Sequence, residues 1–266
     1  MDGQPATSVP ALDRGLQFGD GVFETLRCED AQPLWLEEHL QRLRTGCLRL
    51  GIDWQQERAA RNELLAAAAH APRGLLKLIV TRGDARARGY APQGDERCRR
   101  ILLRYELDRS AQSTAPLRVG LSTVPLAENP RLAGIKHLNR LEQVLAQQEA
   151  RQEGWDEALM CTCAGQLISG SMSNVWLWLH GRLVTPALDA AGVAGVTRRV
   201  VLARAARTGT AVVVRTVART EVQDASSIYL SNVRLGLVPV ADLAGRALAP
   251  HPQLEALRRG LDAETA

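Results

Sequence analysis

Three short apolar runs follow one another between residues 157 and 186, and turns that contain glycine separate them. The runs are EALMCTC, GQLISGSMSNVWLWL and GRLVTP, and together they have the composition of consecutive β-strands with tight glycine turns. Comparable runs predict extended structure elsewhere, namely in the N-terminal stretch up to GDGVFETLRC and at 74–82, 99–107, 117–124, 211–217 and 226–233. The chain is therefore expected to build much of its fold from β-sheet.

Helical patterns alternate with these strands. Apolar residues at steps of four and three (Leu36, Leu40, Leu43, Cys47 and Leu50) predict an amphipathic helix. A second helix is expected over about 54–70, a third follows 127–140 and continues to about 153, and 191–209 is a glycine-rich turn entering another. The C-terminal segment is expected to be partly helical. The fold class is accordingly α/β or α+β.

A short polar segment divides the chain. DRSAQSTAP at 108–116 consists mainly of small and polar residues with one proline, which is typical of a linker. A chain of 266 residues, 45% of them hydrophobic, has enough length for two packed domains. We expect an N-terminal domain over 1–112 and a C-terminal domain over 117–266.

Composition excludes several function classes. No apolar run approaches the roughly 20 residues of a membrane span, and the N-terminus lacks the pattern of a signal peptide. Five scattered cysteines predict a reduced, cytoplasmic protein, and the C-x-C pair at 161–163 has no nearby histidine for a metal site. The net charge of +4 is spread along the chain and only 4% of residues are aromatic, which favours a small anionic partner over nucleic acid.

Lysine is almost absent from a basic chain. Of 33 Lys and Arg residues, only Lys77 and Lys136 are lysines, which leaves 31 arginines. A lysine that persists can occupy a position where arginine fails, because only lysine forms a Schiff base or acts as a neutral amine. Lys136 lies between apolar residues just before a helix, which favours a nucleophile, although a paired structural lysine has the same pattern. Lys77 lies within a strand, where a packing role at the edge of the core is favoured over catalysis.

Three further segments carry candidate binding residues. GVAGVTRR at 192–199 enters a helix at Thr197, and free N–H groups at a helix start bind phosphate, although such starts are common. Arg42 borders the apolar stripe of its helix, so it either reaches a phosphate or lies on the surface. The loop around Arg82, Arg86, Arg88 and Tyr90 is either a lid over a carboxylate substrate or a solvated loop.

Six motifs occur in order at natural spacing: FGDGVFETLR (18–27), HLQRL (39–43), RGYAP (88–92), NPRLAGIKHLNRLEQVLA (129–146), SGSMSNVWL (169–177) and GVAGVTR (192–198). Together they resemble the branched-chain and D-amino-acid aminotransferase-like family of pyridoxal-phosphate enzymes, the fold-type IV group. The resemblance implies a two-domain fold of the D-amino-acid aminotransferase type, with pyridoxal 5'-phosphate in the cleft between domains, and a homodimer.

The resemblance also implies individual roles. Lys136 matches the lysine that binds the cofactor covalently, and Arg42, Val196 and Thr197 match residues that hold its phosphate. Thr25 matches a threonine implicated in catalysis by the lyases of the family, and Asn232 aligns with one of their active-site asparagines. Arg88 and Tyr90 are candidates for substrate binding by their loop position alone.

One position departs from the family pattern. Most members have a glutamate five residues before the asparagine that is Asn174 here, and that glutamate pairs with the pyridine nitrogen of the cofactor; this chain has Ser169. A carboxylate keeps the nitrogen protonated and makes the ring a strong electron sink, whereas a hydroxyl leaves it largely neutral. We therefore hypothesise that Ser169 is tolerable in a lyase and damaging in a transaminase.

The GIKHLNRLEQ run is similar to the aminodeoxychorismate lyases within this family. That resemblance implies a folate-pathway enzyme that eliminates pyruvate from 4-amino-4-deoxychorismate and leaves 4-aminobenzoate. The alternative is a D-amino-acid or branched-chain aminotransferase of the same fold, which shares Lys136, Arg42 and the phosphate turn. A non-catalytic anion- or nucleic-acid-binding protein is a third alternative, and it differs by lacking the yellow cofactor.

Overall fold

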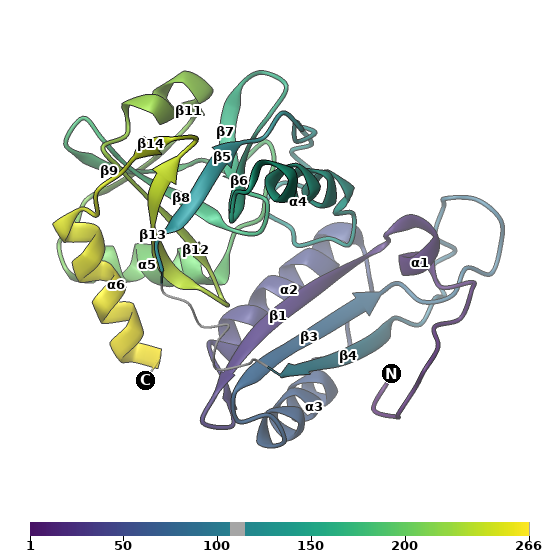
Figure 1. The fold of residues 1–266 in the computed structure, drawn as a ribbon. Helices are drawn as coiled ribbons and strands as arrows, with labels where there is room; N and C mark the ends of the chain where they lie inside the picture. The colour runs from purple at the N-terminus through teal and green to yellow at the C-terminus, as the bar shows by residue number, and fades with distance from the viewer. Residues whose placement is uncertain (107–114, 266) are drawn as a thin grey trace. The chain divides into compact units, whose positions relative to one another are not determined.

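The structure is a computed structural model that describes residues 1–106 and 115–265 (Figure 1). The chain forms two compact units, one comprising Met1–Ala111 with Ile135–Asn139 and the other Gln112–Gly134 with Arg140–Ala266. Helices and two sheets confirm the mixed α/β class. The linker predicted at 108–116 lies outside the described residues, except for 115 and 116.

The segment Ile135–Asn139 belongs to the first unit, although the sequence analysis includes it in a C-terminal domain over 117–266. Its backbone explains the difference. The N–H of Phe23 donates to the carbonyl of Lys136 at 2.9 Å, and the N–H of Leu138 donates to the carbonyl of Gly21 at 3.0 Å. The segment thus adds a short antiparallel pairing to the first unit's sheet, and this long-range pairing leaves no local signal in the sequence.

The first unit contains a four-stranded antiparallel sheet in the order β2-β1-β3-β4 among the described residues. Its strands are β1 Gly21–Glu29, β2 Gln32–Pro33, β3 Gly74–Thr81 and β4 Arg99–Glu106. Its helices are α1 Arg14–Phe18, α2 Leu36–Leu50 and α3 Glu57–Ala69. The predicted helix at 36–50 and the predicted strands at 74–82 and 99–107 are confirmed, and the second predicted helix begins three residues later than expected.

Buried and half-buried residues alternate along β1 and β3, so the two faces of this sheet differ in burial. Val22, Leu26, Leu76 and Leu78 are buried in one cluster with apolar residues of α2 and α3, so these helices cover that face (Figure 1). The intervening residues, including Thr25, are only half-buried and lie on the opposite face. The apolar stripe of α2, with Leu40, Leu43 and Cys47, supplies the packing.

Helix α1 corrects the expectation of extended structure before GDGVFETLRC. The side chain of Asp13 accepts hydrogen bonds from the N–H groups of Gly15 and Leu16 at 2.8 and 3.2 Å, which caps the helix. Gly19 ends it with a positive φ of 65°. A five-residue helix has too few positions to show a helical period, so the sequence pattern did not reveal it.

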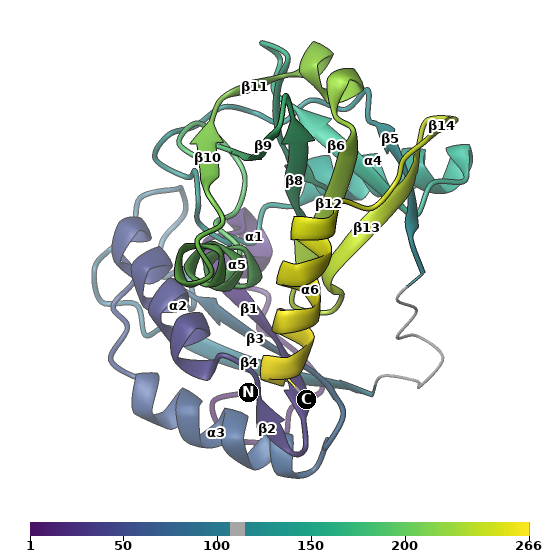
Figure 2. The same cartoon turned by 90° about the vertical axis from the view of Figure 1, so that its left-hand side faces the viewer.

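The second unit contains a ten-stranded sheet among the described residues, in the order β10-β9-β8-β12-β13-β5-β6-β7-β11, with β14 paired to β13 (Figure 2). Its strands are β5 Leu117–Leu121, β6 Glu157–Cys161, β7 Gln166–Gly170, β8 Asn174–Leu179, β9 Arg182–Pro186, β10 Val212–Arg215, β11 Val217–Ala218, β12 Ser227–Asn232, β13 Gly236–Leu243 and β14 Arg246–Ala247. Its helices are α4 Leu141–Glu153, α5 Val196–Arg207, the 3-10 helix η2 Arg219–Asp224 and α6 Pro252–Thr265.

Strand β13 lies inside this sheet between β12 and β5, yet the sequence analysis does not anticipate it. Pro239 within the strand lacks an N–H donor and argues against an interior position. Burial overrides that preference, because Leu237, Val238 and Val240 each expose 3% of their surface or less. The predicted strands and glycine turns between 157 and 186 correspond to β6, β7, β8 and β9.

Candidate active site

Lys136 lies in the first unit, opposite Phe23 on the edge of β1. The register is set by the bridge between Val22 and His137, so Lys136 and Phe23 are on the same face of the sheet. The Nζ atom of Lys136 lies 4.3 Å from the centroid of the Phe23 ring, within the range of a cation–π contact. The lysine is half-buried, and its amine is therefore held against an apolar surface.

Arg42 on α2 is fixed by Glu24 on β1. The Nε and NH2 groups of Arg42 donate to the two carboxylate oxygens of Glu24 at 2.8 and 2.5 Å. Burial favours a raised pKa for Glu24, but Arg42 and His39 outweigh it and hold the pKa at about 2. The guanidinium is thereby oriented and its charge balanced by a buried carboxylate.

His39 completes this cluster. Its Nδ1 lies 2.6 Å from the Glu24 carboxylate, and burial lowers the pKa of the ring, so the neutral ring donates through Nδ1. Its Nε2 then presents a lone pair that is buried without a hydrogen-bond partner among the described residues. His39 is the first residue of the HLQRL motif, and the sequence alone gives it no role of its own.

The start of α5 in the second unit has the features of an anion site. Gly195 precedes the helix with no side-chain cap, and the first turn contains no acidic residue. The first N–H groups of a helix have no partner within it. The hydroxyl of Thr197 is buried without a hydrogen-bond partner among the described residues, and Val196 beside it is 4% exposed.

Asn174 at the start of β8 holds this turn in place. Its Nδ2 donates to the carbonyl of Val193 at 2.9 Å. A Cβ atom at Gly195 would lie 2.1 Å from the Oδ1 of Asn174, so only glycine fits where the turn approaches this side chain. The N-terminus of α5 is thus positioned by a contact from the sheet.

Ser169 lies on β7 opposite Met160 of β6 and exposes 8% of its surface. Its hydroxyl makes no hydrogen bond to any described residue. The hydroxyl is thus available to a ligand that supplies a hydrogen-bond acceptor or donor.

Glu157 on β6 is a site residue that the sequence analysis missed. Its carboxylate is buried at 3% exposure and accepts hydrogen bonds from the N–H groups of Ser171 and Met172 at 3.1 and 3.2 Å. It also accepts from the hydroxyls of Ser171 and Ser173 and from the Nε2 of Gln147. The turn at 171–173, which joins β7 to β8, is therefore built around this carboxylate.

Asn232, at the end of β12, also contacts this turn. Its Nδ2 donates to the carbonyl of Met172 at 3.3 Å, and its Oδ1 accepts from the N–H groups of Arg234 and Leu235 at 3.0 and 2.8 Å. The second unit thus brings Asn232 together with the turn that follows Ser169.

Thr25 and the candidate residues of the loop, Arg88 and Tyr90, belong to the first unit and differ in burial. Thr25 is half-buried on the face of the sheet opposite to α2 and α3. Arg88 is exposed, and Tyr90 exposes 82% of its surface while its ring centroid lies 5.4 Å from that of Phe18. The carbonyl of Tyr90 accepts a hydrogen bond from Arg14 at 2.6 Å, which ties the loop to α1.

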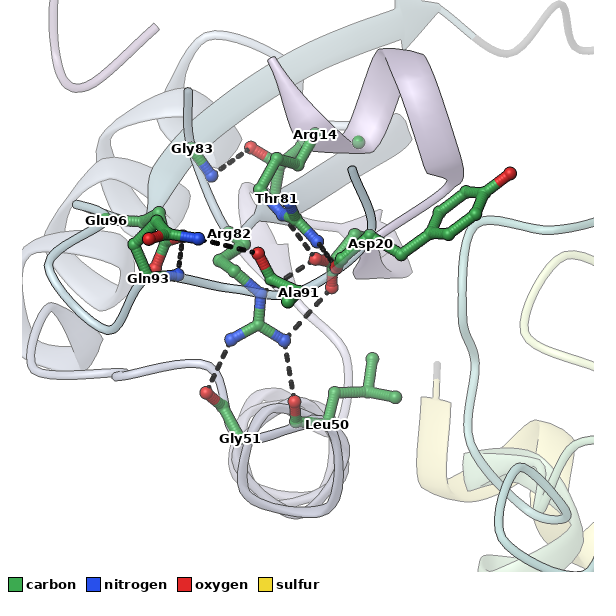
Figure 3. A network of polar contacts seen from close by, with 12 residues as sticks. Arg14, Asp20, Leu50, Gly51, Thr81, Arg82, Gly83, Ala91, Gln93 and Glu96 are labelled. Carbon is green, nitrogen blue, oxygen red and sulfur yellow. Dashed lines mark hydrogen bonds and ion pairs between the residues drawn. The ribbon is translucent and has the colours of Figure 1, made fainter. Parts of the chain in front are cut away.

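Arg82 is not free to act in a lid. It is 8% exposed and donates to the carboxylate of Asp20 and to the carbonyls of Leu50 and Gly51 at the end of α2 (Figure 3). Arg14 also donates to Asp20. The side chain therefore anchors the base of the loop, and only Arg86 and Arg88 remain exposed.

Comparisons with known proteins place the chain in a family. The sequence model of the family "Amino-transferase class IV" matches residues 21–243. The chain belongs to the class IV aminotransferases. It is 30% identical to an aminodeoxychorismate lyase from Vibrio harveyi over 92% of this chain and 90% of that protein. It is 29% identical to a D-alanine aminotransferase from Listeria monocytogenes over 91% and 84% of the two chains.

A solved structure of this family resembles the whole chain. The 4-amino-4-deoxychorismate lyase from Pseudomonas aeruginosa is 40% identical, with a TM-score of 0.92 over 99% of this chain and 97% of that one. Within residues 1–106 and 115–265, no helix has the length and apolar content that crossing a bilayer requires. The described residues contain no group of three or more His, Cys, Asp or Glu that could hold a metal ion.

Class IV aminotransferases are pyridoxal-phosphate enzymes, and the residues present fit this cofactor. The orphaned hydroxyl of Thr197 and the uncapped start of α5 suit a phosphate. The unpartnered hydroxyl of Ser169 suits a ring nitrogen, and Lys136 supplies a primary amine.

Proposed function

We propose that the protein is a 4-amino-4-deoxychorismate lyase that uses pyridoxal 5'-phosphate and releases pyruvate and 4-aminobenzoate. The observation that carries the proposal is the 40% identity with the P. aeruginosa lyase over nearly the entire chain. Ser169 supports it independently, because elimination does not require a carboxylate at the pyridine nitrogen. A cytoplasmic location and a homodimer are part of the same proposal.

Residues of both units would hold the cofactor. Lys136 would bind it covalently, Val196 and Thr197 would hold the phosphate through N–H groups and a hydroxyl, and Ser169 would hydrogen-bond the ring nitrogen. Arg42, oriented by Glu24, would add a cation for the phosphate. When bound, the cofactor withdraws electrons from the substrate carbon that bears the amine.

The remaining chemistry is assigned to this chain's own side chains. The Lys136 amine removes the proton from C4 of the substrate ring as general base. The C3–O bond breaks, its electron pair leaves with the oxygen, and the ring becomes aromatic. Thr25 positions the proton that converts the departing enolpyruvate to pyruvate. Substrate and products balance without an oxidant, a reductant or water.

A product assay tests the proposal. Cofactor-loaded protein is given 4-amino-4-deoxychorismate, and 4-aminobenzoate and pyruvate are followed together. We expect equal release of the two products, and none from Lys136→Ala. Lys136→Arg is expected to fail as well, because a guanidinium stays protonated and forms no covalent bond to the cofactor. Near-full activity of either variant would refute the role of Lys136.

The D-alanine aminotransferase relative favours a second candidate function. A transaminase of this fold would share Lys136, Arg42 and the start of α5. Yellow, cofactor-loaded protein that releases neither product from 4-amino-4-deoxychorismate, but transfers the amine of D-alanine to 2-oxoglutarate, would establish this alternative.

A further inference from the structure

Both lysines of this arginine-rich chain lie over one aromatic ring. The Nζ of Lys77 is 5.0 Å from the centroid of Phe23, and the Nζ of Lys136 is 4.3 Å from the same point. The sequence favours a packing role for Lys77 at the edge of the core. In the structure it lies on β3, an interior strand paired with both β1 and β4.

Lys77 shares a face of the sheet with the residues proposed for catalysis. It is paired directly with Thr25 of β1, and directly opposed residues in an antiparallel sheet point to the same side. Phe23 lies two residues before Thr25 and therefore on that side too. This is the face opposite to α2 and α3.

The ammonium group of Lys77 has no anionic partner among the described residues. The side chain is half-buried, and among the described residues its only interaction is with the Phe23 ring. Buried arginines of the same unit are paired: Arg14 and Arg82 with Asp20, and Arg100 with Glu63. A half-buried cation without an anionic partner is unfavourable until an anion joins it.

We propose that Lys77 binds the carboxylate of the enolpyruvyl group of the substrate, an inference that rests on the proposed function. This group is attached at C3, next to the C4 carbon where Lys136 takes the proton. Lys77 is also opposite Thr25, the residue proposed to act on the departing group. A cation there stabilises the negative charge that forms as the C3–O bond breaks.

Binding of two inhibitors to the cofactor-loaded enzyme tests the proposal. Chorismate carries both carboxylates but a hydroxyl in place of the amine, whereas 4-aminobenzoate lacks the enolpyruvyl group. Lys77→Met is expected to weaken chorismate binding about tenfold or more and to leave 4-aminobenzoate binding unchanged. Lys77→Arg, which keeps the charge, is expected to recover most of the lost affinity.

Arg104→Met is the matched control. It removes the same charge from the adjacent strand β4, where Arg104 is opposite the core residue Leu76 and thus on the other face of the sheet. Its affinity for both inhibitors is expected to equal that of the wild type. Melting temperature and cofactor absorbance verify that each variant is folded and loaded.

Amine acetylation gives a readout that does not depend on activity. Because the chain has only two lysines, modification of Lys77 by acetic anhydride can be followed on a single peptide, with the N-terminal amine as reference. Saturating chorismate is expected to slow acetylation of Lys77 about fivefold or more, and 4-aminobenzoate is expected to have no effect.

The outcomes separate this inference from the proposed function. Equal weakening of both inhibitors by Lys77→Met, unchanged chorismate binding, no protection from acetylation, or a Lys77→Arg variant as weak as Lys77→Met would each overturn the role of Lys77. Absence of 4-aminobenzoate from the wild-type enzyme given 4-amino-4-deoxychorismate would instead refute the proposed function, because that assay does not involve the variants.

Discussion

Ser169 is the residue that most directly links this chain's sequence to a choice between reactions. It lies on β7, and its hydroxyl makes no hydrogen bond to any described residue. We expect Ser169→Glu to raise transamination between D-alanine and 2-oxoglutarate about tenfold or more above the wild-type level, because a carboxylate would keep the ring nitrogen protonated. The measurement is the initial rate of pyruvate formation from D-alanine.

Ser169→Gln is the control for this change, since it matches glutamate in size and carries no charge. If the glutamate variant transaminated no faster than the glutamine variant, the electronic explanation of Ser169 would be wrong.

The buried Glu24 carboxylate makes stability depend on pH. Its pKa is lowered from 4.5 to about 2 in the folded protein, so its contribution is complete above about pH 4.5 and is lost as the pH falls toward 2. That difference corresponds to about 3 kcal/mol. We expect Glu24→Gln to be less stable than the wild type at pH 6, with a smaller difference at pH 3.

Urea unfolding at pH 6, 4 and 3 measures this difference. A difference between wild type and Glu24→Gln that stayed constant over these three pH values would contradict the assignment of a lowered pKa to Glu24.

At the scale of elements, a substitution at the start of α5 is expected to change cofactor binding without lowering the stability of the protein. The Thr197 hydroxyl has no hydrogen-bond partner in the described protein, so Thr197→Val removes no internal bond. We expect its free energy of unfolding to stay equal to that of the wild type or to rise by about 1 kcal/mol. Its affinity for pyridoxal phosphate is expected to fall about tenfold, because a phosphate loses one donor.

Fluorescence titration of the cofactor-free protein measures the affinity, and urea unfolding measures the stability. Thr208→Val is the control, because Thr208 lies at the other end of α5 and its hydroxyl donates within the helix terminus to Arg204. If both variants bound the cofactor equally well, the phosphate site would not be at the start of α5.

The turn between β7 and β8 depends on one carboxylate. Replacing Glu157 by glutamine leaves a single acceptor oxygen where the N–H groups of Ser171 and Met172 and two hydroxyls converge. We expect Glu157→Gln to lower the free energy of unfolding by about 2–4 kcal/mol. Glu153→Gln, an exposed position at the end of α4, is expected to change it by less than about 0.5 kcal/mol.

Chemical denaturation of the two variants side by side is the measurement. A Glu157→Gln variant as stable as Glu153→Gln would show that the turn does not depend on the carboxylate.

At the scale of the whole molecule, the sequence predicted those elements whose signal is local. The apolar period of α2 and the short apolar runs of β3 and β4 appear within a few turns or residues of chain, and the structure confirms them. The role of Glu157 was not predictable, because its donors in the turn lie 14 to 16 residues further along the chain. Strand β13 was missed because burial outweighs the poor strand preference of Pro239.

In the candidate site, too, residues within local motifs were predictable and residues placed by long-range contacts were not. The resemblance identified Lys136, Thr197 and Ser169 from motifs, but it gave no reason to examine Lys77. The pairing of Lys77 with Thr25 connects two residues that are more than 50 positions apart, and no local pattern encodes such a register. The role of Arg82 as a loop anchor likewise depends on carbonyls at the end of α2.

The proposed homodimer is a prediction about the assembled molecule. We expect light scattering of the purified protein to give about twice the mass of the 29.0 kDa chain at micromolar concentration. A mass equal to that of one chain in cofactor-loaded, active protein would refute the dimer.

The five-residue segment Ile135–Asn139 has a consequence for biosynthesis. It supplies the first unit with the pairing beside Phe23, but the ribosome makes it only after the preceding part of the second unit. Domains usually fold as units while the nascent chain emerges, N-terminal first. Here the first unit cannot be completed co-translationally until residue 139 has left the exit tunnel. A nascent chain stalled before that point is therefore expected to expose the edge of β1, where chaperones or aggregation partners can bind.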